Sequence, residues 1–500
     1  MDGQLWQTFD AADFYRVIPG DRLTTILATA GAFVKDLNLR GCLQMQVERH
    51  ARILSDACHN VERLTLEGSH ADRDSISAFL TRNHRLVHLN LSGLKGVTNS
   101  TCRDLGQHCP QLESLNLNWC YNMNARGLVR IIEGCPRLMD LRVNECRGLT
   151  DPAILDLLFT TNRLERLLLH ACADIRDEHL RILFEGLDPE ICPLTRRALV
   201  PPRQLRHLDI SKIPHLTDVG LRSLVGNVPH LQGLQLGGNA HLTDDALSAL
   251  LPTIPQLTHL DLEELPGLTN ETAKRIASGP AHMHLHHLTV SYCERLGDTG
   301  MLPLIRACRS LRNLEMDNTR ISDLCLAEAA DVVRSRKSRS SLDNTSTTTT
   351  KATTPHIGLR LVVYDCPHVT WTGIREVLAQ NAEVRRPTPT GWTSPTHPTE
   401  IIQLKCFYGW QMTVDEHSKR VLRGDLAAAG RLARRWGEYM MATEEAGTPG
   451  AGGRRRRRRR AREAAMLHAD EEEAGLVVQV GAGVGAGRRR RARSGGCLVM

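Results

Sequence analysis

Residues 112–120 read Leu-Glu-Ser-Leu-Asn-Leu-Asn-Trp-Cys, and the pattern Leu-x-x-Leu-x-Leu that opens this stretch returns about every 26 residues along the chain. We number the positions of each unit as slots, so that Leu112 is slot 1 and Cys120 is slot 9. A self-similar unit of this length predicts a solenoid, in which each unit packs only on its neighbours. The first slots are Val34, Val61, Leu86, Leu112, Leu138, Leu164, Leu205, Leu231, Leu257, Leu285, Leu311 and, in a degenerate form, Gly358.

Each unit combines a strand with a helix. In residues 112–118 leucines alternate with Ser and Asn, so the leucines of a strand point inward and the polar residues outward. Residues 124–134 then place Leu128, Ile131 and Ile132 on one stripe of a short helix. Neither half can bury its apolar side alone. The sequence therefore predicts an α/β horseshoe with a parallel sheet on the concave side and helices on the convex side.

Two further features recur between the strands and helices. A Leu-Thr-Asp link, as in residues 216–218 and 242–244, supplies the Thr or Asp that a helix N-cap prefers. Cysteine occupies slot 9 in many units, at Cys42, Cys120, Cys146, Cys172, Cys293 and Cys366. Together with Cys109 and Cys135 at helix ends, these residues resemble the cysteine-containing leucine-rich repeats of F-box proteins. The resemblance covers about residues 34 to 380. The repeats themselves are predicted over residues 34–384, with inserted loops at 187–204 and 334–357.

The resemblance implies a function in ubiquitin transfer. It implies the substrate-recognition subunit of an SCF (Skp, cullin, F-box) ubiquitin ligase, which holds a protein target on the concave face and has no active site or cofactor of its own. A monomer is expected. The rival interpretation is a repeat scaffold that sequesters a regulatory partner without ubiquitin, and a third is a GTPase activator built on similar repeats, for which no Arg stands out as a finger.

Residues 1–33 are predicted to form helical pieces. They can serve simply as a cap that closes the open end of the solenoid. The alternative is a remnant of the F-box-like helical region, because Leu5 and Trp6 resemble the Leu-Trp pair near the end of that domain and would then contact the Skp adaptor. The other adaptor-contacting helices would lie upstream of Met1, so we expect either a truncated gene product or a chain that has lost adaptor binding.

Slots 3, 5, 7 and 8 face away from the core and supply the candidate target-binding residues. Their side chains turn acidic toward the carboxyl end, which predicts a partner segment bearing Lys or Arg; simple solvation of the strand face is the alternative. Exposed aromatic residues at Trp119, Tyr292 and Tyr364 are natural anchors, unless they pack against the loop that follows. The candidates are Asn116, Asn118, Trp119, Arg142, His259, Asp261, Glu263, Tyr292, Glu315 and Asp317.

Segments outside the repeats have distinct compositions. Loop 187–204 is rich in proline, while 334–357 carries an Arg-Ser run and a Thr run that predict a disordered segment, either phosphorylated or a passive linker. Residues 385–400 are predicted to be a flexible linker. Residues 401–446 are predicted to form a cap of one strand and one helix over 414–442, whose apolar stripe docks on the solenoid end.

The last 54 residues are predicted to be a disordered tail with a lipid anchor. Residues 447–500 contain 13 Arg and five acidic residues, so the net charge of +7 belongs to the tail. The chain ends Cys-Leu-Val-Met, a C-a-a-X box that predicts farnesylation of Cys497. One lipid and a basic patch together bind acidic membranes, as in a prenylated subgroup of F-box proteins that this ending resembles. The basic patch is Arg488, Arg489, Arg490, Arg491 and Arg493.

The remaining composition favours an intracellular protein. Cysteines 26 residues apart fit buried slots better than a disulfide framework, and neither a secretory signal nor an apolar run of about 18 residues is present. We therefore expect the cytosolic face of membranes, with the nucleus as the alternative if Arg454–Arg460 bind nucleic acid, which we do not expect without interleaved aromatics. His282–His287 is a weak hint of metal, weighed against ordinary surface histidines; no metal is predicted.

Overall fold

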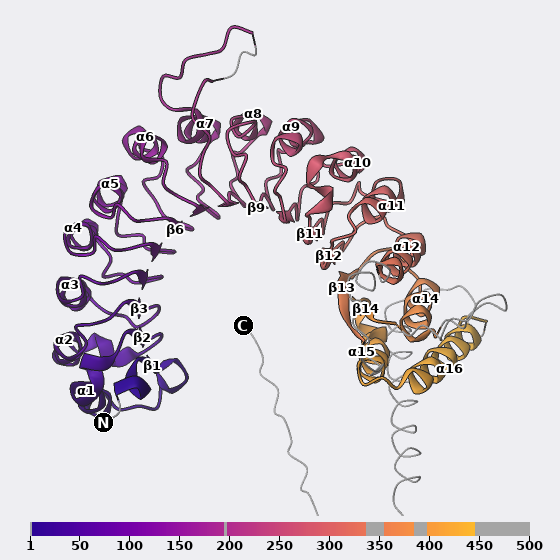
Figure 1. The fold of residues 1–500 in the computed structure, drawn as a ribbon, viewed down its shortest axis with the longest axis horizontal. Coiled ribbons are helices and arrows are strands. Elements are labelled where there is room, and N and C mark those ends of the chain that lie inside the picture. The colour runs from indigo at the N-terminus through magenta and orange to yellow at the C-terminus, as the bar shows by residue number, and fades with distance from the viewer. Residues whose placement is uncertain (1–2, 195–197, 337–354, 385–397, 446–500) are drawn as a thin grey trace, which may run out of the picture.

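Each unit from Val34 to Leu311 forms a three-residue strand at slots 3 to 5, and a helix or 3-10 turn follows it. The computed structural model describes residues 3–194, 198–336, 355–384 and 398–445. These residues form a leucine-rich-repeat solenoid of the α/β class, curved into a horseshoe with the strands on the inner side and the helices on the outer side (Figure 1). The predicted fold class is confirmed.

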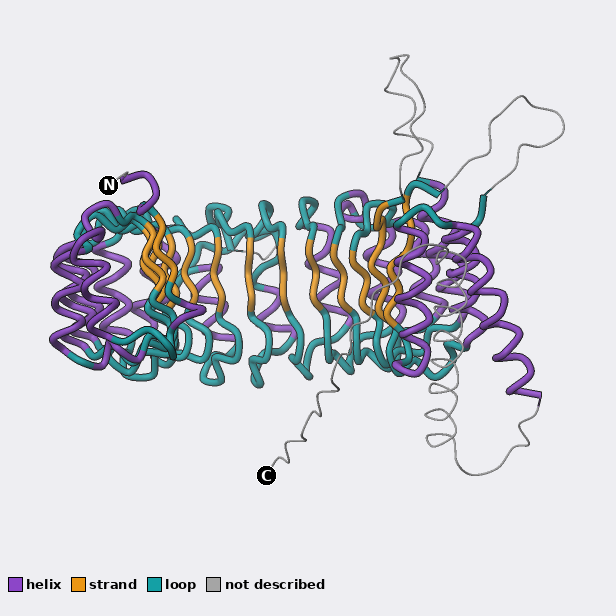
Figure 2. Tube along the Cα trace, turned by 90° about the horizontal axis from the view of Figure 1, so that it is seen from below, coloured by secondary structure: helices purple, strands orange, loops and turns teal. Residues whose placement is uncertain are grey.

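The described strands form one parallel sheet of fourteen, in chain order (Figure 2). They are β1 (Thr8–Asp10), β2 (Asp36–Asn38), β3 (Arg63–Thr65), β4 (His88–Asn90), β5 (Ser114–Asn116), β6 (Asp140–Arg142), β7 (Arg166–Leu168), β8 (His207–Asp209), β9 (Gly233–Gln235), β10 (His259–Asp261), β11 (His287–Thr289), β12 (Asn313–Glu315), β13 (His356–Val362) and β14 (Glu400–Lys405).

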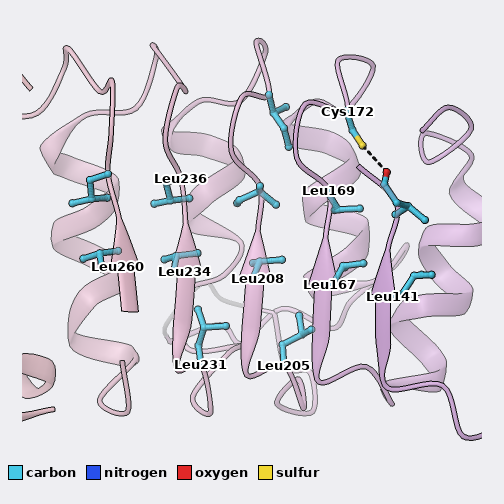
Figure 3. Close-up of a cluster of buried hydrophobic side chains, with 14 of the residues drawn as sticks. Leu141, Leu167, Leu169, Cys172, Leu205, Leu208, Leu231, Leu234, Leu236 and Leu260 are labelled. Carbon is cyan, nitrogen blue, oxygen red and sulfur yellow. Dashed lines mark hydrogen bonds between the residues drawn. The ribbon is translucent and has the colours of Figure 1, made fainter. Parts of the chain in front are cut away.

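The register places the slot-4 leucines side by side through the sheet, as Leu141 pairs with Leu167 and Leu208 pairs with Leu234. These side chains point away from the concave face and, with slots 1 and 6, form one continuous apolar core (Figure 3). Nearly all are less than 5% exposed. Burial of a leucine side chain stabilises a fold by about 2 kcal/mol, so the ladder is the main source of cohesion between units.

The described α-helices cover the convex side. They are α1 (Gly20–Ala30), α2 (Glu48–Ala57), α3 (Arg73–Arg82), α4 (Asn99–His108), α5 (Ala125–Gly134), α6 (Pro152–Thr161), α7 (Asp177–Glu185), α8 (Asp218–Arg222), α9 (Asp244–Leu250), α10 (Asn270–Ser278), α11 (Asp298–Ala307), α12 (Asp323–Ser335), α14 (Trp371–Ala382), α15 (Tyr408–Leu422) and α16 (Leu426–Glu445). None of these combines the length and the apolar composition that crossing a bilayer requires.

The Thr-Asp pairs link neighbouring units as well as capping helices. Thr243 caps α9 by accepting the N–H of Asp245, as the sequence predicts. The carboxylate of Asp244 instead reaches the next unit, where it accepts the N–H and hydroxyl of Thr269 at 3.0 and 2.6 Å. It also accepts both groups of Thr272. The same clasp recurs from Asp177, Asp218, Asp298 and Asp323 to Thr217, Thr243, Ser322 and Thr370.

Slot 9 provides a second link between units. The thiol of Cys172 donates to the carbonyl oxygen of Val143 in the preceding unit at 3.3 Å (Figure 3), and Cys146 donates likewise to Leu117. Asn239 makes the equivalent bond to Ile210 at 2.9 Å. Burial raises the pKa of the Cys172 thiol to about 12, so the thiol keeps the proton that it donates. In these units slot 9 therefore supplies a buried donor to the preceding unit, whereas Leu94, Ile213 and Leu265 fill the same slot with apolar side chains.

The two ends differ from the sequence predictions. Residues 1–33 include a strand, β1, that extends the sheet in register with β2, so this region is not helical throughout. The C-terminal cap has two helices, because Gly424 has a φ of +85° and ends α15 one turn before α16 begins. Its apolar stripe packs at the solenoid end as predicted, with Trp436 only 3% exposed. Helix α12 continues to Ser335, beyond the predicted start of the second loop at 334.

Substitution of Asp244 tests the clasp. Asp244→Ala is expected to lower the free energy of unfolding by about 2 kcal/mol, because four donors lose a charged acceptor. Burial opposes ionisation of this carboxyl, but hydrogen bonds from Thr269 and Thr272 hold its pKa below the ordinary 3.8. The contribution is therefore complete above pH 3.8 and is lost as the pH falls through the lower folded-state pKa.

Denaturant unfolding of the wild type, Asp244→Ala and Asp244→Asn at neutral and acidic pH measures this contribution. Asp245→Ala is the matched control, because this neighbouring carboxylate is exposed. Equal losses for the two positions would show that the clasp adds nothing beyond a charge at the helix start.

Candidate functional site

The concave surface carries three rows of side chains, from slot 3, slot 5 and slots 7 and 8. Slots 3 and 5 belong to the strands, and the following residues turn out of the sheet. In every unit the slot-8 residue has a left-handed backbone, with φ between +51° and +74°. Glycine accepts this conformation freely, but Trp119 and Tyr292 adopt it at φ values of 60° and 62°, which bulky residues rarely do.

Slot 7 is less available than the slot rule predicts. Its N–H lies outside the strand ladder and needs a side-chain acceptor from slot 5 of its own unit or slot 7 of the unit before. Asn116 accepts the N–H of Asn118, and Asn118 accepts that of Asn144. Asn118 is only 8% exposed, so its assignment as a target-binding residue is wrong. Its amide serves the backbone, and Asn116 shares that role.

Two acidic candidates combine a backbone contact with partial exposure. Asp317 accepts the N–H of Tyr364 at 2.7 Å, and Asp261 accepts that of Glu263 at 3.0 Å. In each of these residues the second carboxylate oxygen accepts no hydrogen bond among those observed in the described ranges. They remain on the concave surface with fixed orientations, so a partner would find these carboxylates in place.

Basic and acidic side chains neutralise one another in the amino-terminal half. Asp36 accepts from Arg63 at 2.9 Å across two strands. Asp140 accepts two bonds from Arg142, at 2.9 and 3.2 Å from its two oxygens, and lies 3.5 Å from Arg166. Hydrogen bonding to Asp140 raises the pKa of Arg142. One carboxylate thus faces two guanidinium groups.

Acidic side chains around β10, in the carboxyl-terminal half, repel one another instead. Burial, with repulsion from Asp209 and Glu315, raises the pKa of Asp261 despite the N–H that it accepts. Burial, with repulsion from Asp261 and Glu264, likewise raises the pKa of Glu263. A cationic partner would relieve this repulsion, which is the electrostatic basis for predicting a segment with Lys or Arg here.

Histidines occupy slot 3 beside these carboxylates. The rings of His259 and His287 stack at 4.2 Å between centroids with an angle of 9°. Burial and the neighbouring histidine lower the pKa of His259, while burial and His286 lower that of His287, so both are mainly neutral at pH 7. Within the described residues, no group of three or more His, Cys, Asp or Glu side chains has the arrangement of a metal site.

An aromatic pair stands at the rim of the concave face. Trp119 and Tyr121 are 44% and 53% exposed, and both donate to Glu145: the indole Nε1 at 2.9 Å and the phenol at 3.2 Å. The carboxylate fixes their orientation without covering them. The alternative that slot-8 aromatics are buried by the next loop is wrong for Trp119 and for Tyr292, which is 46% exposed; Tyr364 is half-buried.

One unit has very few side chains on the concave face, a feature that the sequence analysis did not predict. The β9 unit has glycine at slot 3, slot 7 and slot 8, namely Gly233, Gly237 and Gly238. Two hollows lie beside these glycines, with volumes of about 440 and 260 Å³. Gln235 lines both hollows and His207 lines the larger one; neither residue was among the predicted ones.

The other predicted sites lie at the ends. Leu5 is 79% exposed and Trp6 is half-buried in a 3-10 turn (Gly3–Trp6) at the amino-terminal end of the solenoid. The predicted lipidation site Cys497 and its arginines, and most of segment 334–357, lie outside the described residues. Arg334, which begins that segment, is buried at 8% exposure and pairs with Glu383 at 3.3 Å.

Comparison with known proteins gives similarities at the level of the repeat fold. No family model matches the sequence. A crystal structure of the yeast Rad7 and Elc1 complex matches at 17% identity over 70% of this chain and 89% of that chain, with a TM-score of 0.41. An internalin (InlF) of Listeria monocytogenes matches at 16% identity over 63% and 77%, with a TM-score of 0.33. TLR13 in complex with ssRNA13 matches at 17% identity over 59% and 41%, with a TM-score of 0.36.

Glu263→Gln tests the repulsion within the acidic half. We expect this substitution to raise the free energy of unfolding by about 0.5 kcal/mol at low salt and by less at high salt, because it removes one of several adjacent carboxylates. Thermal unfolding at two salt concentrations measures the effect. Glu165→Gln is the control, since Glu165 pairs with Arg206 at 3.3 Å and its loss should not stabilise. Lower stability of Glu263→Gln would contradict net repulsion.

Proposed function

We propose that this chain is the target-recognition subunit of an SCF-type ubiquitin ligase and binds a protein on its concave face. One observation carries the recognition part of the proposal: charged and aromatic side chains line the hollow side of the sheet. No described helix crosses that side (Figure 1). A curved, rigid, polar surface of this kind suits the binding of another protein.

The link to ubiquitin rests on the repeat chemistry. The cysteines of slot 9 and the Thr-Asp links resemble those of F-box proteins, and the structure gives both features a role between units. The exposed Leu5 side chain at the amino-terminal end offers an apolar contact for the adaptor domain that the resemblance implies. Target and adaptor would then bind at different parts of one rigid body.

Such a subunit acts by proximity. It needs no active site, because cullin-bound enzymes supply the chemistry and the solenoid holds the target near the charged ubiquitin carrier. Holding two reactants together makes their encounter intramolecular, and it raises the effective concentration of each reactant near the other. The rigid sheet contributes by keeping the distance between the target and the adaptor end constant.

Affinity purification with concave-face variants tests this function. We expect the tagged full-length chain to retain a target protein together with a Skp-class adaptor and a cullin. Substitution of Glu263, Glu264 and Glu315 by Lys should reduce retention of the target by about tenfold or more, because three negative charges become positive. Retention of the adaptor and the cullin should not change. Quantitative mass spectrometry of the purified complexes measures both.

The matched control changes the same number of charges elsewhere. Glu133, Glu376 and Glu438 are exposed on α5, α14 and α16, and their substitution by Lys should leave target retention unchanged. Retention of a concave-face target without adaptor or cullin would overturn the ligase assignment in favour of a scaffold. Equal retention by both triple variants would overturn the concave face as the binding surface.

The proposal includes membrane attachment through Cys497. We expect Cys497→Ser to move the chain from the membrane fraction to the supernatant, because one prenyl group and a basic patch act together. Neutralising Arg488 to Arg491 should weaken attachment to acidic vesicles, each arginine contributing about 1 kcal/mol. Fractionation and the mass of the terminal peptide provide the measurements; an unmodified terminal peptide from membranes would contradict this part.

A further inference from the structure

The middle of the concave face has a hollow that crosses the strands, with a volume of about 440 Å³. Its lining belongs to slots 3 to 5 of the strands from β6 to β12. At its centre Gly233 of β9 pairs in register with His207 of β8 and with His259 of β10. The slot-3 row therefore lacks a side chain at β9, and we call the open space around this position the central hollow.

The backbone does not require glycine at this position, because Gly233 has no positive φ. A Cβ added to it would lie only 2.5 Å from Nδ1 of His207, which is too close for two such atoms. The imidazole of His207 therefore lies over the glycine and forms one wall of the central hollow. The ring of His259 lines the hollow from the strand on the other side. The missing side chain thus leaves a gap with an imidazole ring on either side.

One face of the His259 ring is open toward this gap. The other face is covered by His287 of β11, whose ring lies nearly parallel, with 4.2 Å between the centroids and an angle of 9°. Because these two residues pair in register on adjacent strands, the stack runs from β10 toward β11. The uncovered face therefore points toward β9, where Gly233 has no side chain to fill the space. A flat group of a partner can stack on this face.

Hydrogen bonds fix the position of the His259 ring and the nitrogen that carries its proton. The hydroxyl of Thr258 donates its single proton to the carbonyl oxygen of Gln232 at 2.9 Å. It must then accept from Nδ1 of His259, at 2.8 Å, which leaves Nε2 of the neutral ring as an acceptor. Burial, with His287 beside it, lowers the pKa of His259. The ring is therefore mainly neutral at pH 7 and does not repel a cation.

A carboxylate lies on the same strand, two residues further along. Asp261 occupies slot 5 of β10 and lines the central hollow together with His259. One of its oxygens accepts the N–H of Glu263 at 3.0 Å, and the other accepts no hydrogen bond among those observed in the described chain. Burial, with repulsion from Asp209 and Glu315, raises the pKa of Asp261. A cation placed beside it would stabilise its charged form.

The arginines that line the central hollow do not neutralise this carboxylate. Arg142 and Arg166 lie on β6 and β7, toward the far end of the hollow, and contact Asp140 at 2.9 and 3.5 Å. On β9, β10 and β11 the described lining includes no Lys or Arg. The part of the hollow near β10 therefore combines a flat ring face with a carboxylate and has no permanent cation of its own.

A guanidinium group matches both of these features. It is flat and stacks on ring faces, it is always charged, and its N–H groups donate to carboxylates. The ammonium group of lysine would reach the carboxylate without stacking, and an aromatic side chain would stack without bringing a charge. We propose that the central hollow binds an arginine side chain of the target, with the guanidinium stacked on the open face of His259 and donating hydrogen bonds to Asp261.

This inference rests on the proposed function, since it names the side chain that the concave face would recognise. NMR titration of the full-length chain, labelled in its histidine side chains, tests it. The probes are the N-acetyl methylamides of arginine, lysine, citrulline and tyrosine; citrulline keeps the flat group of arginine and lacks its charge. The imidazole resonance of His259 reports occupancy and is identified by its loss in His259→Gln. The resonance of the exposed His59, which lies after α2, is the internal control.

We expect the arginine probe to shift the His259 resonance saturably and to bind about fivefold or more tightly than the other three probes, a difference of about 1 kcal/mol. Asp261→Asn should weaken arginine binding about fivefold, while the new side-chain oxygen can still accept the N–H of Glu263. Gly233→Leu should weaken it similarly by filling the gap without a change of charge. Asp36→Asn, at slot 3 of β2, removes a carboxylate outside the hollow and should change nothing.

Equal binding of arginine and either lysine or citrulline, tighter binding of tyrosine, no saturable shift of His259, or full affinity in Asp261→Asn would overturn the inference. Circular dichroism and thermal unfolding establish that the two hollow variants are folded.

The purified-complex assay distinguishes this failure from failure of the proposed function. If the variant with three Lys substitutions loses the target while Asp261→Asn and Gly233→Leu keep it, the hollow is not the recognition site and the concave-face function stands. If arginine occupies the hollow but the chain retains no target, the proposed function fails and the binding site stands.

Discussion

The structure depends on the fact that no unit can bury its leucines by itself. Each slot-4 leucine lies in register with the slot-4 leucine of the next strand, so its apolar surface leaves water only when a neighbour is in place. The polar links also join neighbouring units: the carboxylate of Asp244 bonds to the next unit, and the thiol of Cys172 bonds to the preceding one. Cohesion is therefore a property of the stack.

That constraint also explains the ends. The first and last units have one neighbour each, and segments with different sequences close them. At the amino-terminal end β1 adds a strand with Phe9 where other strands have leucine. At the other end Trp436 lies in edge-to-face contact with Trp371 and Trp410, which covers the last leucine layer with aromatic surface. A repeat pattern cannot predict such segments, because they do not repeat.

Periodicity predicted the repeating part of the fold well, because units of 26 residues with alternating leucines can all bury those leucines by stacking as a solenoid. It did not predict β1, because that segment lacks the leucine pattern. It also did not predict the helix break at Gly424, because the apolar residues before and after this glycine continue the same helical spacing. For the candidate site, the slot rule placed Trp119 and Glu263 on the concave side. It could not distinguish Trp119 from Asn118, because the demand of the slot-7 N–H for an acceptor is visible only in three dimensions.

The concave face has carboxylates in its amino-terminal half whose charges are satisfied, and a cluster of carboxylates around β10, in its carboxyl-terminal half, whose charges are not. Asp36 and Asp140 are neutralised by arginines on neighbouring strands, so a partner gains little by replacing those contacts. Asp261 and Glu263 have raised pKa values and only a few cations near them, so a cationic partner gains both attraction and relief of repulsion. The rigid sheet keeps these carboxylates together in the free protein. Recognition energy should therefore concentrate in the carboxyl-terminal half, where folding leaves the electrostatics incomplete.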